Sequence, residues 1–351
     1  MRSGSNTSVC GLTENSIDSQ LNMAGTRKFM ENRKLNCVAI GGGNGLSTLL
    51  LGLKEYVGSE IGELAAIVAV TDDGGSSGRL RDELQMPPPG DIRNCMVALS
   101  EDSLLLSKLF RFRFSGEGHL GGHSFGNLFL AALSEITGDF AEAVRLSSEI
   151  LASKGHIYPA TDSDVRLAAK LADGTTIQGE TNIGKAGPMI ERLFLDPETC
   201  HPLPAAIEAI KAADIITIGP GSLYTSLLPP LLVSGVADAI ANSPAIKIFI
   251  CNLMTQPGET DGMTSRRHVE IIGDYVPQIG FDRILINSEP ISQEQAERYE
   301  HEGAEQIGVH GSISGGLIGG ARVIYGNLLD EGIKVRHAPN KLAKAILSFA
   351  A

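Results

Sequence analysis

Residues 35–57 read LNCVAIGGGNGLSTLLLGLKEYV, in which a short apolar run meets a glycine-rich loop and then a helical pattern. Residues 63–73, ELAAIVAVTDD, supply a second apolar run. The three segments together predict a strand, a helix and a strand. Because the runs are almost continuously apolar, we expect both faces of each strand to be buried, which is typical of a parallel sheet between two layers of helices.

The rest of the chain continues this alternation. Further strands are predicted at residues 213–221, 245–253 and 282–288, with helices between them. We therefore predict an α/β fold, a three-layer, Rossmann-like, doubly wound and mainly parallel sheet, for residues 34–351 as a single nucleotide-binding domain. Residues around 100–200 differ, because helical patterns at 104–112 and 127–151 precede a short stretch of β character, and we expect a helical and small-sheet insertion there. Residues 1–33 are rich in Ser, Asn, Thr and Gly and are predicted to be a disordered tail.

Composition excludes several classes of protein. The chain has 351 residues, a formal net charge of −12 and five cysteines without a CxxC pair, so neither a disulfide framework nor a zinc site is expected. No apolar run approaches the roughly 20 residues that cross a bilayer, and no secretory signal is recognisable. We therefore expect a cytoplasmic protein without membrane insertion. The negative charge makes nucleic acid an unexpected partner.

The first loop, residues 41–47, is predicted to bind phosphate. Glycines let the backbone approach an anion, and the start of the following helix offers free N–H groups. The spacing does not fit the dinucleotide pattern GxGxxG, so NAD is not expected. The alternative is a tight turn without a ligand. The predicted ligand contacts are Gly42, Gly43, Asn44, Gly45 and Ser47.

Two polar segments follow the second strand. Residues 71–84, TDDGGSSGRLRDEL, place carboxylates able to hold a divalent cation beside arginines able to bind phosphate oxygens. Residues 86–95, MPPPGDIRNC, present further charges on a segment that three prolines stiffen. The alternatives are a flexible solvated loop and a plain helix start capped by Asp91. The predicted contacts are Asp72, Asp73, Ser76, Ser77, Arg79, Arg93 and Asn94.

Three later segments complete the predicted site. Residues 118–133 place His123 and Ser124 at a glycine-rich helix start, but a third zinc ligand or a catalytic acid is not apparent, so hydrogen bonding is favoured over catalysis. Its alternative is a purely structural helix start. Residues 218–232 and 249–260 each follow a strand with small, hydroxyl and amide residues, which form an anion nest and could contact a base or sugar. The predicted contacts are His123, Ser124, Asn127, Gly219, Gly221, Ser222, Thr225, Ser226, Asn252, Thr255 and Gln256.

These motifs occur in one order that resembles the YvcK-like gluconeogenesis factor family. GGGNGLS, TDDGGSSGRLR, PPPGDIRN, GHSFGNLFLAAL, GPGSLYTSLLP and NLMTQPGET all lie within the resemblance, which covers residues 35 to about 349. The family shares a fold with the phospholactate transferases of deazaflavin-cofactor synthesis. The resemblance implies a nucleotide-sugar ligand such as UDP-N-acetylglucosamine, and a regulatory role in cell shape and wall synthesis during gluconeogenic growth.

The resemblance also assigns individual residues. Asp73 and Asp91 match acids near the metal, Mg²⁺, and the phosphates, and Arg336 matches an arginine of the nucleotide-sugar site. A strand through Ile333 and Val335 is predicted to place Arg336 at a strand-to-helix junction, the alternative being a surface arginine.

Three functions remain to be distinguished: a nucleotide-sugar sensor acting on a partner such as a cell-wall-synthesis protein, a phospholactate-type group transferase, and a nicotinamide-dependent dehydrogenase. The sensor is favoured and the dehydrogenase is disfavoured. No catalytic residue is assigned. The sequence leaves open whether the protein forms a homo-oligomer.

Overall fold

The computed structural model describes residues 33–101, 104–186, 189–308 and 316–349. Apart from Arg33, the predicted disordered tail, residues 1–33, lies outside the described residues. Leu35–Ala351 cluster as one compact unit, and all the elements below belong to it.

The centre of this unit is an eight-stranded sheet with the order β10-β11-β9-β8-β7-β1-β2-β3. Every pair of neighbours is parallel except β10 with β11, as the strand pattern predicts for a doubly wound fold. The strands are β1 (Leu35–Gly41), β2 (Ile61–Val68), β3 (His156–Pro159), β7 (Ile215–Ile218), β8 (Ile246–Ile250), β9 (Arg283–Asn287), β10 (Leu317–Ile318) and β11 (Ala321–Gly326).

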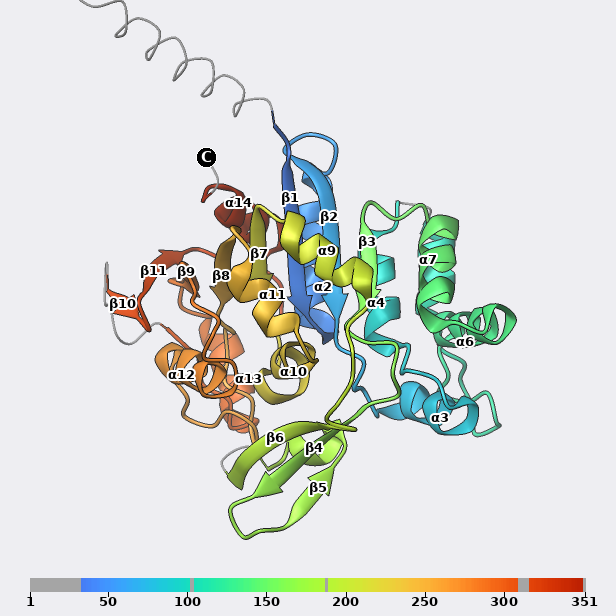
Figure 1. The fold of residues 1–351 in the computed structure, drawn as a ribbon. Helices are drawn as coiled ribbons and strands as arrows, with labels where there is room; N and C mark the ends of the chain where they lie inside the picture. The colour runs from blue at the N-terminus through green and yellow to red at the C-terminus, as the bar shows by residue number, and fades with distance from the viewer. Residues whose placement is uncertain (1–32, 102–103, 187–188, 309–315, 350–351) are drawn as a thin grey trace, which may run out of the picture. The chain divides into compact units, whose positions relative to one another are not determined.

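Helices cover both faces of this sheet, so the predicted three-layer architecture is confirmed (Figure 1). One face carries α2 (Gly43–Leu53), α4 (Gly90–Leu99) and α14 (Pro339–Leu347). The other carries α9 (Pro204–Ala212), α10 (Leu228–Leu232) and α11 (Val236–Asn242). Further helical segments are η1 (Lys54–Tyr56), α3 (Gly75–Leu84), η3 (Leu223–Leu227), α12 (Ser265–Tyr275) and α13 (Gln293–His301).

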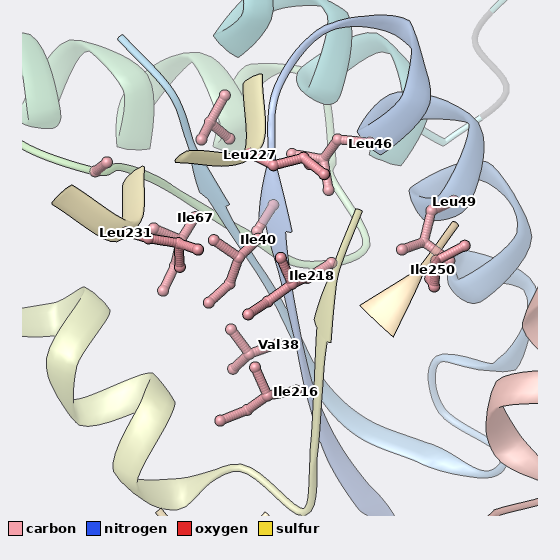
Figure 2. Close-up of a cluster of buried hydrophobic side chains, with 14 of the residues drawn as sticks. Val38, Ile40, Leu46, Leu49, Ile67, Ile216, Ile218, Leu227, Leu231 and Ile250 are labelled. Carbon is pink, nitrogen blue, oxygen red and sulfur yellow. The ribbon is translucent and has the colours of Figure 1, made fainter. Parts of the chain in front are cut away.

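The core lies around β1, the strand that the opening sequence predicts. Figure 2 shows Val38 and Ile40 of β1 beside Ile67 of β2 and Ile218 of β7, and all four are at most 2% exposed. Leu46 and Leu49 of α2 and Leu227 and Leu231 pack in the same cluster. Burial of apolar side chains on both faces of β1 stabilises the sheet at the place where its polar loops begin.

The middle of the chain differs from the prediction in two details. The helical pattern at 127–151 forms two helices, because Gly138 adopts the left-handed conformation that ends α6, and Asp139 caps α7 by accepting from Glu142 N at 3.0 Å. Within the predicted insertion, β3 belongs to the main sheet. The remaining elements are α5 (Leu104–Arg111), α6 (Phe125–Thr137), α7 (Phe140–Ile150) and α8 (Glu180–Ile183), together with an antiparallel sheet of β4 (Arg166–Leu171), β5 (Thr176–Gln178) and β6 (Ile190–Asp196).

Across the described ranges, no single helix is long and apolar enough to cross a membrane. Only the bent pair Leu223–Leu232 and Val236–Asn242 passes that test jointly, by length and composition alone.

Candidate functional site

The sheet reverses its order at β1, and this position defines a topological switch point. Starting at β1, the chain adds β2 and β3 on one side and later adds β7, β8 and β9 on the other. Ile40 of β1 pairs with Ile218 of β7, which pairs with Phe249 of β8, so the three strands end at the same level. Open α/β sheets bind ligands in the crevice that forms at such carboxyl ends.

A cavity of about 520 Å³ occupies this crevice. It is lined by the segments that follow β1, β7 and β8, by the end of α13, and by residues just before α14. The predicted site residues in its lining are Gly42, Gly43, Asn44, Gly45, Gly221, Ser222, Ser226, Asn252, Thr255, Gln256 and Arg336. Thus segments nearly 300 residues apart in sequence meet in one cavity, and its volume suits a small-molecule ligand.

The first loop gives the cavity the uncapped start of α2. Gly42 precedes the helix without a side-chain cap, and Gly43 has φ +61°, a conformation that favours glycine. At Gly45 a Cβ atom would lie 2.3 Å from the carbonyl oxygen of Pro220, so only glycine allows α2 to approach the loop after β7 so closely. The free N–H groups and the positive end of the helix dipole favour an anion here.

Hydrogen bonds hold the loops after β7 and β8 against each other. The side-chain amide of Asn252 accepts from Gly221 N at 3.0 Å and donates to Gly221 O at 2.7 Å. Gln256 Nε2 donates to Ser222 Oγ at 2.7 Å, whereas Gln256 Oε1 is buried and has no partner among the described residues. These two amides make the cavity wall rigid, and Gln256 Oε1 offers an acceptor for a ligand N–H or O–H.

Arg336 reaches the cavity by a route that differs from the prediction. Residues 331–334 form bends, and Leu329 makes an isolated antiparallel bridge with His337, so the predicted strand through Ile333 and Val335 is wrong. Tyr299 Oη accepts from Val335 N at 3.2 Å and ties this segment to α13. The Arg336 side chain is exposed in the cavity, without a hydrogen-bond or ion-pair partner in the described parts of the chain. Its guanidinium is therefore available to a ligand.

Three carboxyl groups gather beside the first loop. Asp91 accepts a hydrogen bond from Gly43 N–H, but desolvation and the nearby Asp72 carboxylate raise the pKa of Asp91 to about 7. Desolvation, Asp72 and Asp91 likewise raise the pKa of Glu180, which lines the cavity, to about 8. Thr225, a predicted contact, is buried and hydrogen-bonds the Glu180 side chain. These carboxyl groups repel one another when ionised, and a cation or a bound proton would relieve the repulsion.

Of the two predicted Mg²⁺ ligands, Asp91 is one of these three carboxyl groups, whereas Asp73 contacts the start of α8. Asp73 Oδ1 accepts from the backbone N and the hydroxyl of Thr181, at 3.2 and 3.1 Å, at the start of α8. The negative charge of Asp72 raises the pKa of both Asp91 and Glu180. Among the described residues, no group of three or more His, Cys, Asp or Glu side chains is arranged to hold a metal ion. The negative charge of the carboxyl groups suits a divalent cation that also binds the phosphates of a ligand. The assignment of Asp73 and Asp91 as the ligands of that cation stays a prediction.

The remaining predicted residues form a second group around the first turns of α3 and α6. Asn127 Nδ2 donates to Ser76 Oγ at 3.2 Å and Ser77 Oγ at 3.4 Å, and His123 Nδ1 lies 3.0 Å from Ser76 Oγ. Ser124 Oγ donates to Phe110 O at 3.1 Å. None of these residues lines the cavity described above. The group comprises Ser76, Ser77, Arg79, Arg93, Asn94, His123, Ser124 and Asn127.

Several side chains in the predicted motifs support the backbone rather than face the cavity. Ser47 Oγ donates to Asn44 O at 3.1 Å, and Gly219, with φ +90°, shapes the loop after β7. Arg81, one of the two arginines of residues 71–84 expected to be able to bind phosphate oxygens, is 1% exposed; it hydrogen-bonds Val165 O and forms an ion pair with Asp164 at 2.6 Å. That guanidinium stabilises the fold and is not available to a ligand.

The cavity also includes residues that sequence reasoning missed. Thr48 lies one turn into α2 and could have been found by helical spacing from Asn44. No motif marks Glu180 or the end of α13, which tertiary packing alone brings to the cavity. The residues without a predicted role are Thr48, Glu180, Tyr299, Glu302, Ala304 and His337; the lining also includes Pro220, Leu253, Met254, Pro257 and Val335, which lie in predicted segments but were not assigned as contacts.

Comparisons with known proteins agree with this fold. Residues 37–329 match the family described as 2-phospho-L-lactate transferase CofD. A protein of Halalkalibacterium halodurans named Gluconeogenesis factor is 47% identical over 315 residues, covering 90% of this chain and 96% of the relative. The Gluconeogenesis factor of Bacillus subtilis is 48% identical over 275 residues, covering 78% of this chain and 86% of the relative.

A crystal structure of protein BH3568 from Bacillus halodurans superposes with a TM-score of 0.83 at 46% identity, covering 90% of this chain and 100% of that one. The family model spans most of the chain, and two relatives named Gluconeogenesis factor exceed 45% identity, which confirms the resemblance found in the motifs. The chain therefore belongs to the 2-phospho-L-lactate transferase CofD family.

Proposed function

We propose that the protein binds a nucleotide-sugar of the UDP-N-acetylglucosamine type in the cavity at the switch point and acts as a regulatory gluconeogenesis factor in the cytoplasm. The observation that carries the proposal is the meeting in one cavity of the uncapped α2 start, the amides of Asn252 and Gln256, and the guanidinium of Arg336, which has no partner among the described residues. These groups match the phosphates, hydroxyls and base of such a ligand in chemical type.

Each group has a distinct task in the proposed complex. The α2 start and Arg336 bind diphosphate oxygens, because a guanidinium forms paired charge-assisted hydrogen bonds with them. Gln256 Oε1, which is buried and without a partner in the described structure, accepts a hydrogen bond from the base or the sugar. Tyr299 supplies an aromatic ring for contact with the base or sugar. The cavity lacks the GxGxxG loop that holds the pyrophosphate of NAD.

The names of the relatives give the biological setting of the proposal. Relatives that are 47% and 48% identical are named Gluconeogenesis factor. We extend that role to this chain, and with it the function in cell shape and wall synthesis during gluconeogenic growth that the sequence resemblance implies. The partner in this setting is a protein of cell-wall synthesis. Expression in a Bacillus subtilis strain that lacks its own factor tests this: the wild-type chain should replace it, and Arg336→Lys should not.

The ligand itself is tested by calorimetric titration and thermal unfolding. A ligand that binds only the native state stabilises it by RT ln(1 + [L]/Kd), about 2.7 kcal/mol at a hundredfold excess over Kd. UDP-N-acetylglucosamine should therefore raise the melting temperature, and NAD at the same concentration should not. Equal or greater stabilisation by NAD would contradict the proposal.

A phospholactate-type transferase is a second candidate, favoured by the family match and by the Asp72, Asp91 and Glu180 carboxyl groups beside the cavity. Such an enzyme releases its nucleotide when an acceptor is present, whereas a regulator binds its ligand without turnover. Incubation with a nucleotide-activated phospholactate and a deazaflavin acceptor, followed by mass spectrometry, separates the two. Nucleotide release that depends on the acceptor would establish the transferase.

A further inference from the structure

Arginine side chains from three parts of the chain converge on the start of α6. Arg79 of α3 donates from Nη2 to Gly121 O at 2.8 Å, and Arg113 donates from Nη1 to Gly122 O. Arg93 of α4 lies alongside Gly126, where a Cβ atom would be 2.9 Å from both its Cγ and its Cδ. A chain of net charge −12 thus concentrates positive charge at one helix end.

These guanidinium groups have no carboxylate at ion-pair distance among the residues that the structure describes. Arg79 and Arg113 are held by main-chain carbonyls, and Arg93 Nη2 donates to Asn94 Oδ1 at 2.6 Å. Neighbouring cations without carboxylate partners repel one another and are stabilised by an anion.

The backbone at the same place is also unsatisfied. Helix α6, which has 13 residues, begins after Ser124 without a side-chain cap. The N–H groups of Gly126 and Asn127 donate no hydrogen bond within the described structure. The side chain of Asn127 is 1% exposed, and its Oδ1 is buried without a partner while Nδ2 contacts Ser76 and Ser77. If the amide is rotated by half a turn, the two hydroxyls donate to Oδ1 and the free group becomes a donor.

We propose that the start of α6 and the guanidinium groups of Arg79, Arg93 and Arg113 form a second anion-binding site, separate from the cavity at the switch point. Its ligand is a phosphate or carboxylate group of a small molecule, held by bidentate guanidinium contacts and by the free N–H groups of the helix. Hydrogen bonds of Asn127 with Ser76 and Ser77 connect the start of α6 to the start of α3. This site goes beyond the proposed function, because it requires no nucleotide.

The carboxyl groups of Asp72 and Asp91 lie between this second site and the cavity at the switch point. Asp91 approaches the first loop, where a Cβ on Gly42 would lie 2.7 Å from Asp91 Oδ2. Asp72 approaches the second site, because a Cβ on Gly90 would lie 2.4 Å from both Asp72 Oδ2 and Ser77 Oγ. Negatively charged groups of the protein therefore separate the anion bound at one site from the anion bound at the other. A second anionic ligand would thus be sensed together with the first, or would occupy the far end of the same extended molecule.

Inorganic phosphate is the probe for this site, titrated at constant ionic strength into the full chain. The readout is the amide NMR signals of Gly126 and Asn127, which should shift on binding and whose titration gives the affinity at this site alone, because phosphate can also bind at the α2 start. Arg79→Gln and Arg113→Gln, both at exposed side chains, should each weaken phosphate binding by about tenfold, as expected for the loss of one charge-assisted contact. Arg145→Gln, at an exposed arginine on α7, is the matched control and should bind phosphate as the wild type does.

The same series separates this site from the cavity. Arg336→Lys should leave the phosphate-induced shifts of Gly126 and Asn127 unchanged, even if no nucleotide-sugar binds anywhere. Titration of UDP-N-acetylglucosamine decides between a separate small anion and the far end of one ligand: only in the second case does Arg113→Gln weaken its binding. The proposal is overturned if phosphate shifts neither amide signal, or if both glutamine variants bind it as tightly as the wild type does.

Discussion

The carboxyl groups beside the first loop predict an unusual pH dependence of stability, which Asp91→Asn should reveal. The pKa of Asp91 is raised from 3.8 to about 7 in the folded protein, first by desolvation and then by Asp72. The folded state therefore binds a proton at pH values where the unfolded chain has released it. This contribution to stability is complete below pH 3.8 and declines as the pH rises, until it is lost above pH 7.

The size of the effect follows from linkage. Each pH unit between the two pKa values changes the free energy of unfolding by about 1.4 kcal/mol. Between about pH 5.5 and the folded pKa of about 7, Asp91 therefore accounts for a loss of about 2 kcal/mol. Glu180, whose pKa is raised to about 8, acts in the same direction. His337, whose pKa is lowered to about 4 by burial, acts in the opposite direction, so only the difference between variants isolates Asp91.

Urea unfolding of the ligand-free protein at about pH 5.5 and pH 8 measures this difference. Asp91→Asn should lose about 2 kcal/mol less stability than the wild type over that interval, since an amide does not ionise and can still accept from Gly43 N–H. Asp162→Asn, at an exposed aspartate, is the control and should follow the wild type. If Asp91→Asn and the wild type show the same pH dependence, the carboxyl groups are not as desolvated as inferred.

Three further predictions concern the cavity. Arg336→Lys should weaken UDP-N-acetylglucosamine binding about tenfold in calorimetry and leave ligand-free melting unchanged, because a lysine cannot form the paired contact; unchanged affinity would mean that Arg336 is a surface residue. Gly45→Ala should cost about 1–3 kcal/mol in urea unfolding through overlap with Pro220 O, whereas Gly273→Ala in α12, with open space around it, should not destabilise. Without Mg²⁺, nucleotide-sugar affinity should fall between about pH 6 and pH 8 as Asp91 ionises, and Mg²⁺ should restore it; an affinity indifferent to both would exclude the metal role.

The sheet was predictable because its central strands carry a strong local signal. The apolar runs that became β1, β2, β7, β8 and β9 are bounded by glycine and polar residues, and burial on both faces explains their composition. β3 was missed, because four residues that include His156 and Pro159 show neither an apolar run nor alternation. It is held in the sheet by pairing with β2, a contact that local sequence does not encode.

The candidate site was predictable to the extent that it lies directly after strands. Loops after β1, β7 and β8 must meet at one edge of a parallel sheet, so Gly43, Gly221 and Asn252 could be placed together from topology alone. Glu180 and Tyr299 could not, because they come from α8 and α13, whose positions depend on packing across the molecule. Arg81 shows the converse: its motif suggested a ligand contact, but burial beside Asp164 gives it a structural role.

The two anion sites and the carboxyl groups between them fit one physical scheme. Helix α2 and helix α6 both begin without a side-chain cap, and each start lies near guanidinium groups that carry no carboxylate partner in the described structure. The negative charges of Asp72 and Asp91 act to raise the pKa of both Arg93 and Glu180. A phosphate bound at either site therefore changes the field on the same carboxyl groups and raises their proton or metal affinity. Because coupling between sites is reciprocal, an anion at α6 should alter nucleotide-sugar affinity most where Asp91 titrates, near pH 7.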